Sequence, residues 1–100
     1  MENINKFVAA AQDIINNYYA KNYPSLTPKT LTVQVATKYV KVWNSRAGVS
    51  ESIHSFINPQ TGEVFMPAST KAPAKHARGN VNSPTNGTEA LTESGSVRYL

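Results

Sequence analysis

The chain of 100 residues contains no cysteine, only two histidines and only six acidic residues. Without cysteine it forms neither disulfides nor thiolate metal sites. His54 and His76 lie far apart, and no carboxylates accompany them at metal-ligand spacing. The acids are too scattered for paired-carboxylate catalysis, and no glycine-rich phosphate loop or nucleophile motif occurs. We therefore expect a protein that is not an enzyme and that holds no metal and no cofactor.

The sequence also lacks a long hydrophobic run. Its N-terminal stretch, MENINKFVAAAQDIINNYYAKNY, carries charged and amide side chains throughout, unlike a signal peptide or a membrane span. We expect a soluble, intracellular protein with no membrane partner. The hydrophobic fraction of 40% is enough for one modest core, and the length is typical of one domain, which we assign to residues 1–100.

Positive charge is concentrated in the middle of the chain. Residues 21–78 hold eight Lys or Arg and two Glu, a net +6, whereas the rest holds two Lys or Arg and four acids, a net −2. A basic centre favours an anionic partner. Ordinary solvated lysines would give the same distribution, so charge alone does not separate the two interpretations.

The segment 1–21 has the pattern of an amphipathic helix. Apolar side chains recur three and four positions apart, at Ile4, Phe7, Val8, Ala11, Ile14, Ile15, Tyr18 and Tyr19. Asn3 is suited to cap the start, and Pro24 disfavours continuation of the helix past Tyr23. A stripe this regular is typical of a helix that packs on a core.

The next two segments predict an extended connector over 22–29 and a β-meander over 30–69. We expect strands over 30–43, 49–57 and 63–69, with a turn at 44–48. The second turn, NPQTG, is the clearest signal, because Asn58 can bond back onto it and Gly62 supplies a left-handed residue. The predicted fold class is α+β, with the N-terminal helix packed on a small, three-stranded antiparallel meander.

Residues 70–100 form the basic turn and the C-terminal segment. Pro73 suits the first position of a helix and Gly79 the position just past its end, so we expect a short basic helical turn over 73–78. Further on, we expect a loop at 83–87, a helical turn within 88–94 capped by Thr88, and a last short strand over 95–100.

One long stretch, FINPQTGEVFMPASTKAPAKHARGN, resembles a small family of uncharacterised proteins of tailed bacteriophages and viral metagenomes. That family has a closely similar KAPAKHARGN segment and an Asn-Gly pair downstream, here Asn86-Gly87. The resemblance covers roughly residues 38–100 and leaves out residues 1–29. It implies a phage origin and expression in the cytoplasm of a bacterial host, and it transfers no catalytic residue.

The segment KAPAKHARGN has the chemistry of a phosphate-binding site. Lysine offers a point charge, arginine a planar fork, and the start of a helix offers free backbone N–H groups. The predicted phosphate ligands are Lys71, Lys75, His76, Arg78, Gly79 and Asn80. A solvated basic turn, with Arg78 and His76 bonded to nearby carbonyls, is the alternative.

A second cluster interleaves cations with aromatic rings in KYVKVW. Its predicted stacking and cationic residues are Lys38, Tyr39, Lys41 and Trp43, joined by His54 and Phe56 from the following strand. Such a sheet face is the layout that single-strand binders use. The alternative is that Tyr39, Trp43 and Phe56 form the core beneath the N-terminal helix.

Three functional hypotheses follow. The first is a non-enzymatic phage protein that binds single-stranded nucleic acid through the basic segment and the adjoining sheet. The second is an anti-defence protein that sequesters a small phosphorylated nucleotide of the host, or blocks a host defence protein directly. The third is a minor virion or assembly component. Basic residues spread over several elements favour the first, a closed pocket at a homo-oligomer interface the second, and a large exposed apolar face the third.

Overall fold

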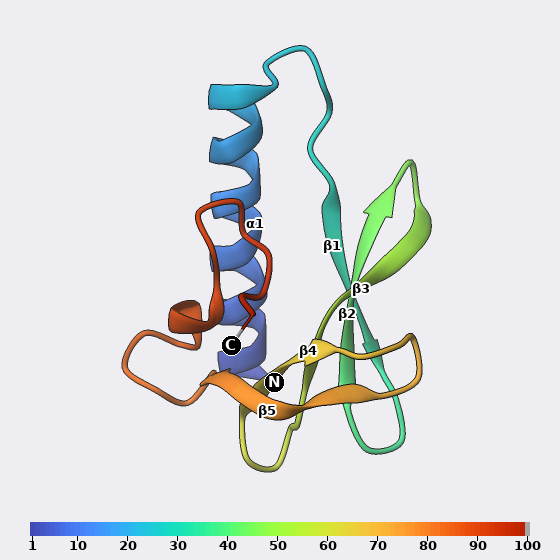
Figure 1. Ribbon diagram of the computed structural model, residues 1–100, viewed down its shortest axis with the longest axis vertical. Coiled ribbons are helices and arrows are strands. Elements are labelled where there is room, and N and C mark those ends of the chain that lie inside the picture. The colour runs from blue at the N-terminus through green and yellow to red at the C-terminus, as the bar shows by residue number, and fades with distance from the viewer. Residues whose placement is uncertain (100) are drawn as a thin grey trace.

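The computed structural model describes residues 1–99 and has one helix followed by a five-stranded sheet (Figure 1). The elements are α1 (Glu2–Asn22), β1 (Thr30–Val35), β2 (Val40–Arg46), β3 (Val49–Ile57), β4 (Glu63–Pro67), β5 (Pro73–Asn80) and the 3-10 helix η1 (Thr88–Ala90). The predicted α+β class, with an N-terminal helix against an antiparallel meander, is confirmed.

Helix α1 packs one face on the sheet. Four of its residues are buried in the core: Ile4, Phe7, Ala11 and Ile15. Met1 is the N-cap, so the prediction that Asn3 caps the helix is wrong; Asn3 instead donates from Nδ2 to Asn82 Oδ1 at 2.8 Å. The helix ends before Tyr23-Pro24, as predicted. No helix within residues 1–99 is long and apolar enough to cross a membrane.

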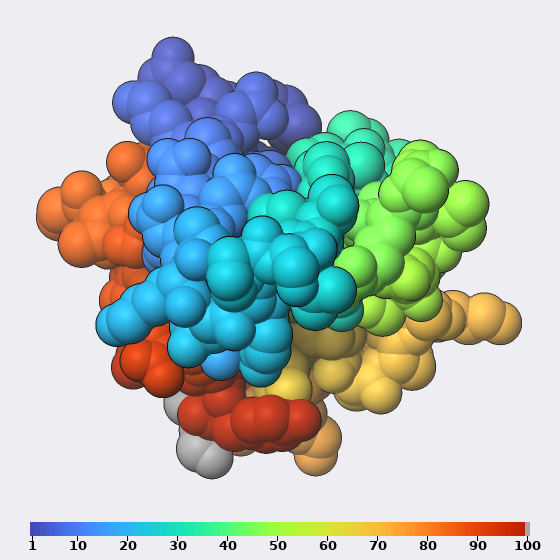
Figure 2. Space-filling view, turned by 90° about the horizontal axis from the view of Figure 1, so that it is seen from above, coloured from blue at the N-terminus to red at the C-terminus, as the bar shows by residue number. Residues whose placement is uncertain are grey.

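The connector, residues 23–29, leads from the end of α1 into β1. Figure 2 looks at this end of the molecule, where the connector (cyan) lies between α1 (blue) and the β2–β3 hairpin (green). Gln12 of α1 anchors the end of the connector and the start of β1. Its side-chain amide donates to Lys29 O at 2.8 Å and accepts from Leu31 N at 2.7 Å.

The sheet runs in the order β1-β2-β3-β4-β5, and every neighbouring pair is antiparallel. The prediction of three strands is wrong at two places. The expected strand 30–43 is split by a turn at 36–39, which Ala36 N closes by donating to Tyr39 O at 3.0 Å. The turn predicted at 44–48 is also shorter than expected: β2 continues to Arg46, and the turn consists of Ala47 and Gly48.

The second error concerns the basic segment, which is not a helix. Pro73–Asn80 forms β5 at the edge of the sheet, and its pairs include Val64↔Gly79 and Phe65↔Ala77. A single turn of helix is marginal by its own propensity, and pairing with β4 outweighs it. Pro73 has no backbone N–H to donate, but this is tolerated at the first residue of an edge strand, where no hydrogen bond between central strands is lost. The helical N–H groups expected to attract phosphate are therefore absent from 73–78.

The 58–62 turn forms as predicted. Asn58 Oδ1 accepts from Gln60 N at 2.9 Å and from Thr61 N at 3.3 Å. Gly62 has φ +82°, and a Cβ atom there would meet Asn80 and Asn82. The turn is thus shaped both by its own sequence and by the strand end that packs against it.

The C-terminal segment returns across α1. The predicted helical turn shortens to η1, and the predicted strand 95–100 is reduced to a single bridge, Leu91↔Val97. Residue 100 of that predicted strand lies outside the described residues. The chain turns too tightly for a strand, since Thr92 N donates to Ser96 O at 2.8 Å. Buried Val81, Ala90 and Val97 complete the core.

Candidate functional site

The sheet has an inner face against α1 and an outer face turned away from it. A row formed by Val40, Ile57 and Val64 pairs across β2, β3 and β4, and all three residues belong to the core cluster with α1. Side chains alternate along strands, so the neighbouring row Lys41–Phe56–Phe65 lies on the outer face.

The outer face carries a small aromatic cluster. The ring of Tyr39 lies 5.8 Å from that of Phe56 and 6.1 Å from that of Phe65, both in edge-on geometry. Phe56 is fully buried, whereas Tyr39 and Phe65 keep part of their surface exposed. Trp43, also half-buried, donates from Nε1 to Gln34 Oε1 at 2.9 Å. The alternative that Tyr39, Trp43 and Phe56 form the core beneath α1 is therefore wrong.

Two lysines lie over this cluster, as the KYVKVW pattern predicts. Lys38 Nζ is 5.4 Å from the ring centre of Tyr39, and Lys41 Nζ is 5.8 Å from that of Phe56. Lys41 Nζ also donates to Thr70 O at 2.9 Å. This bond holds the β4–β5 loop near the aromatic cluster and brings the neighbouring Lys71 with it. The start of the basic segment, at Lys71, is thus brought to the aromatic cluster.

The basic segment itself divides into free and engaged side chains. Lys71, Lys75 and His76 are exposed, and Figure 2 shows the β4–β5 loop (yellow-orange) projecting from the surface. Arg78 is engaged: it donates to Arg98 O at 3.3 Å and to His76 O, and it lies 4.0 Å from Met66 Sδ. All three of its guanidinium nitrogens therefore have partners within the protein, whereas Lys41 uses one of its three N–H donors on Thr70 O and keeps two for a phosphate.

Gly79 and Asn80 have structural roles. A Cβ atom on Gly79 would lie 3.0 Å from Ala90 Cβ, so the glycine lets η1 pack closely on β5. Asn80 donates to Thr61 O at 3.0 Å and accepts from Asn82 N at 2.8 Å, which ties the 58–62 turn to the end of β5. Both residues are therefore engaged within the fold, unlike the exposed lysines.

His54 is separated from the other predicted site residues. Its neighbours Ser55 and Ile53 pair with Val42 and Trp43, so His54 is the extra residue of a β-bulge. Because of the bulge, the His54 side chain points to the inner face of the sheet. There it is buried, and its ring lies 6.4 Å from that of Phe7. Its Nε2 hydrogen-bonds Gly95 O at 2.7 Å. His54 therefore does not belong to the aromatic outer face.

The chemistry of His54 follows from these partners. Because a carbonyl oxygen only accepts, Nε2 carries the proton, and Nδ1 accepts from Ser55 Oγ at 3.0 Å. Burial lowers the pKa of His54, although the bond to Gly95 acts in the opposite direction. The imidazole is neutral near pH 7 and works as a structural link.

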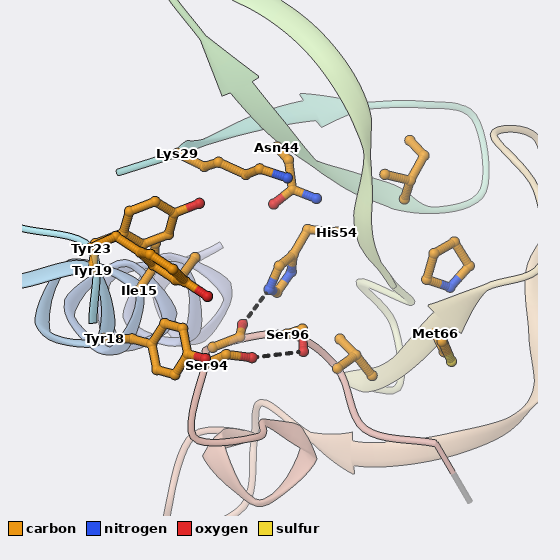
Figure 3. A pocket seen from close by; sticks show the side chains of 14 residues that line it. Ile15, Tyr18, Tyr19, Tyr23, Lys29, Asn44, His54, Met66, Ser94 and Ser96 are labelled. Atoms are coloured by element: carbon orange, nitrogen blue, oxygen red, sulfur yellow. Dashed lines mark hydrogen bonds between the residues drawn. The ribbon is translucent and has the colours of Figure 1, made fainter. Parts of the chain in front are cut away.

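On the inner side, a cleft of about 310 Å³ opens between the C-terminal half of α1, strands β2–β4 and residues 94–97 (Figure 3). Its polar and aromatic lining includes Tyr18, Tyr19, Tyr23, Lys29, Asn44 and His54. This cleft was not predicted from the sequence. The three tyrosines near the end of the helix were its one visible signal, because Lys29 and Asn44 reach the cleft only through the fold.

The tyrosines form one side of the cleft. Tyr23 meets Tyr18 at 6.0 Å and Tyr19 at 5.7 Å between ring centres, both edge-on. The neighbouring Tyr23 is the main cause that raises the pKa of Tyr18. In residues 1–99 no three His, Cys, Asp or Glu side chains lie together as in a metal site.

Comparison with known proteins adds a family and no activity. Searches of curated proteins and of solved structures gave no significant match. A family model described as a family of unknown function, DUF7717, matches residues 2–100, and the chain therefore belongs to that family.

Proposed function

We propose that the outer face binds single-stranded nucleic acid without catalysing a reaction. Bases stack on the partly exposed rings of Tyr39, Trp43 and Phe65, and phosphates pair with Lys38, Lys41, Lys71 and Lys75. The observation that carries the proposal is the bond from Lys41 Nζ to Thr70 O, at 2.9 Å. It joins the lysine-bearing β4–β5 loop to the aromatic cluster.

The spread of the lysines supports an extended ligand. Lys38 lies in the β1–β2 turn, Lys41 on β2, Lys71 in the β4–β5 loop and Lys75 on the edge strand β5. Four cations from four separate segments are better suited to contact successive phosphates along a nucleic-acid backbone than to enclose one small anion. The rings are sequence-tolerant platforms, since stacking contributes about 1–3 kcal/mol per base. We therefore propose weak sequence preference and strong salt dependence.

The biological setting is part of the same proposal. The resemblance of residues 38–100 to proteins of tailed bacteriophages supports a phage origin and a role in the cytoplasm of an infected bacterium. Single-stranded nucleic acid is a ligand that phage replication and expression supply there.

The experiment is a titration of a labelled, mixed-sequence oligonucleotide followed by fluorescence anisotropy at several salt concentrations. Four phosphate contacts predict a slope of log K against log salt of about −3, because each contact on a single strand contributes about −0.7. Lys41→Gln and Lys71→Gln should each make the slope shallower by about 0.7. Tyr39→Leu should weaken binding about tenfold, the equivalent of about 1.4 kcal/mol.

Lys6→Gln is the matched control, since Lys6 is an exposed lysine on α1 that pairs with Glu2. Its slope and affinity should equal those of the wild type. The proposal is wrong if the wild-type protein does not bind the oligonucleotide at low salt, or if the outer-face variants behave like Lys6→Gln.

A further inference from the structure

We propose that the cleft on the inner face is a second, independent binding site, and that its ligand is a single nucleotide: a planar ring that carries one phosphate. This site lies on the opposite side of the sheet from the aromatic cluster described above and goes beyond the function proposed for that cluster. The shape of the cleft, its three tyrosines and the Lys29 ammonium favour this ligand.

The aromatic side offers ring surface to a planar ligand. Tyr18 and Tyr19 come from the last turns of α1, and Tyr23 follows the helix end, so three rings project from one short segment. Tyr23 is 46% exposed, which leaves part of its ring open to a ligand despite its contacts with both other tyrosines. Tyrosine rings bind nucleobases by stacking, and tyrosine hydroxyls form hydrogen bonds to the base edge.

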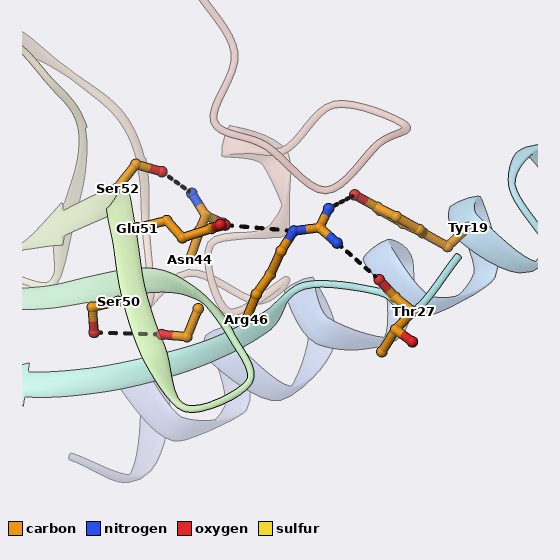
Figure 4. A network of polar contacts seen from close by, with 8 residues as sticks. Tyr19, Thr27, Asn44, Arg46, Ser50, Glu51 and Ser52 are labelled. Carbon is orange, nitrogen blue, oxygen red and sulfur yellow. Dashed lines mark hydrogen bonds and ion pairs between the residues drawn. The ribbon is translucent and has the colours of Figure 1, made fainter. Parts of the chain in front are cut away.

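Arg46 holds Tyr19, one of the tyrosines that line the cleft, in place (Figure 4). Its guanidinium donates to Tyr19 Oη at 3.2 Å and to Thr27 O at 3.3 Å, and it pairs with Glu51 at 3.5 Å. Arg46 thus ties the β2–β3 hairpin to both the helix end and the connector. A ring that is already oriented loses less conformational entropy when a ligand binds.

The opposite side is polar. Lys29 and Asn44 line the cleft, and in Figure 3 the Lys29 side chain extends toward Asn44. Lys29 is half-buried, and within residues 1–99 its ammonium makes no ion pair. A half-buried cation without a carboxylate neighbour is suited to an anionic group such as phosphate.

The far wall is the C-terminal loop. Ser94 and Ser96 line the cleft, and their hydroxyls form a hydrogen-bonded triangle with Thr92 Oγ1, at oxygen–oxygen distances of 2.9, 3.0 and 3.3 Å. A hydroxyl oxygen has two lone pairs, so each serine can still accept a hydrogen bond from a sugar hydroxyl. The bond from His54 Nε2 to Gly95 O sets the position of this wall. His54 is therefore a positioning residue here, because both of its ring nitrogens already have partners within the protein.

The volume limits the size of the ligand. About 310 Å³ lies at the lower end of the range of about 300–1,000 Å³ for small-molecule sites. A cleft of this size accommodates one base with its sugar and phosphate and is too small for a dinucleotide. This limit separates the site from the outer face, which is open along several strands.

The test is isothermal titration calorimetry of the full chain with AMP, UMP, adenosine and inorganic phosphate. We expect AMP or UMP to saturate one site per chain, and inorganic phosphate alone to bind at least tenfold more weakly. Lys29→Gln should weaken the nucleotide about tenfold and leave adenosine unchanged, because only the phosphate contact is lost. Tyr23→Ala should weaken nucleotide and adenosine alike.

The controls keep the two sites distinguishable. Lys41→Gln and Lys6→Gln should leave nucleotide affinity unchanged, and circular dichroism should show that Lys29→Gln and Tyr23→Ala are folded, since neither residue is in the core. The proposal is overturned if neither nucleotide binds saturably, if Lys29→Gln binds as the wild type does, or if Lys41→Gln removes the binding.

Discussion

His54 Nε2 and Gly95 O lie 2.7 Å apart, although the two residues are separated by 41 positions in the sequence. The bond connects the bulge of β3 to the C-terminal loop, and Gly95 in turn lies so close to α1 that a Cβ atom would be 2.5 Å from Ile15 Cγ1. Three parts of the chain therefore meet at one buried imidazole.

The first prediction is a loss of stability in mild acid that depends on His54. Above the ordinary histidine pKa of about 6.5, the imidazole is neutral in both the folded and the unfolded chain. Below it, the unfolded chain binds a proton that folded His54 resists, because burial lowers its pKa. The free energy of unfolding should therefore fall by up to about 1.4 kcal/mol per pH unit until the folded pKa is reached.

Urea unfolding between pH 7.5 and pH 5 measures this dependence. His54→Gln should flatten it, whereas His76→Gln, at an exposed position, should keep it. Equal pH profiles for His54→Gln and the wild type would show that another group is responsible.

The second prediction concerns Phe7, which is fully buried and contacts the core from α1. Phe7→Ala should lower the free energy of unfolding by about 3–5 kcal/mol, because it removes a large side chain and leaves a cavity. Asn5→Ala, at an exposed position on the same helix, is the control. A Phe7→Ala protein with an unchanged melting temperature and a lost interaction would instead identify α1 as a binding surface.

The third prediction separates two causes of strain at glycine. Gly62 and Gly48 have similar backbones, with φ +82° and +79°, but an added Cβ atom meets Asn80 and Asn82 only at Gly62. Gly48→Val should cost about 1–2 kcal/mol from the left-handed backbone alone. Gly62→Val should cost distinctly more, as measured by thermal unfolding. Equal losses would mean that the packing of the 58–62 turn against β5 contributes little.

The fourth prediction divides the basic segment by role. Arg78 binds backbone carbonyls, so Arg78→Ala should reduce the free energy of unfolding by about 1 kcal/mol and leave the salt slope of oligonucleotide binding unchanged. Lys71→Ala should leave the free energy of unfolding unchanged, because Lys71 is exposed, and should make the salt slope shallower. Thermal melts and anisotropy titrations of the two variants decide this. A shallower slope in Arg78→Ala would return this arginine to the ligand set.

Two features could be read from the sequence because they are specified locally. The apolar stripe of α1 repeats over many turns, and Pro24 lies two residues beyond its last residue, Asn22, so the helix is set by its own spacing and its own stop signal. The 58–62 turn is also local, since Asn58 bonds to N–H groups two and three residues ahead and Gly62 relieves the backbone. The clustering of lysines with aromatic residues in KYVKVW is a local property of the same kind.

The sequence by itself therefore determined a helix before a meander and the residue types of the outer face. The tertiary structure decided the rest, because it depends on pairing between distant segments. Residues 73–80 have weak local preference, and pairing with β4 made them a strand. Which sheet face received Phe56 depended on strand register, and His54 changed sides through a bulge. The cleft exists only because α1, the sheet and the C-terminal loop are packed together.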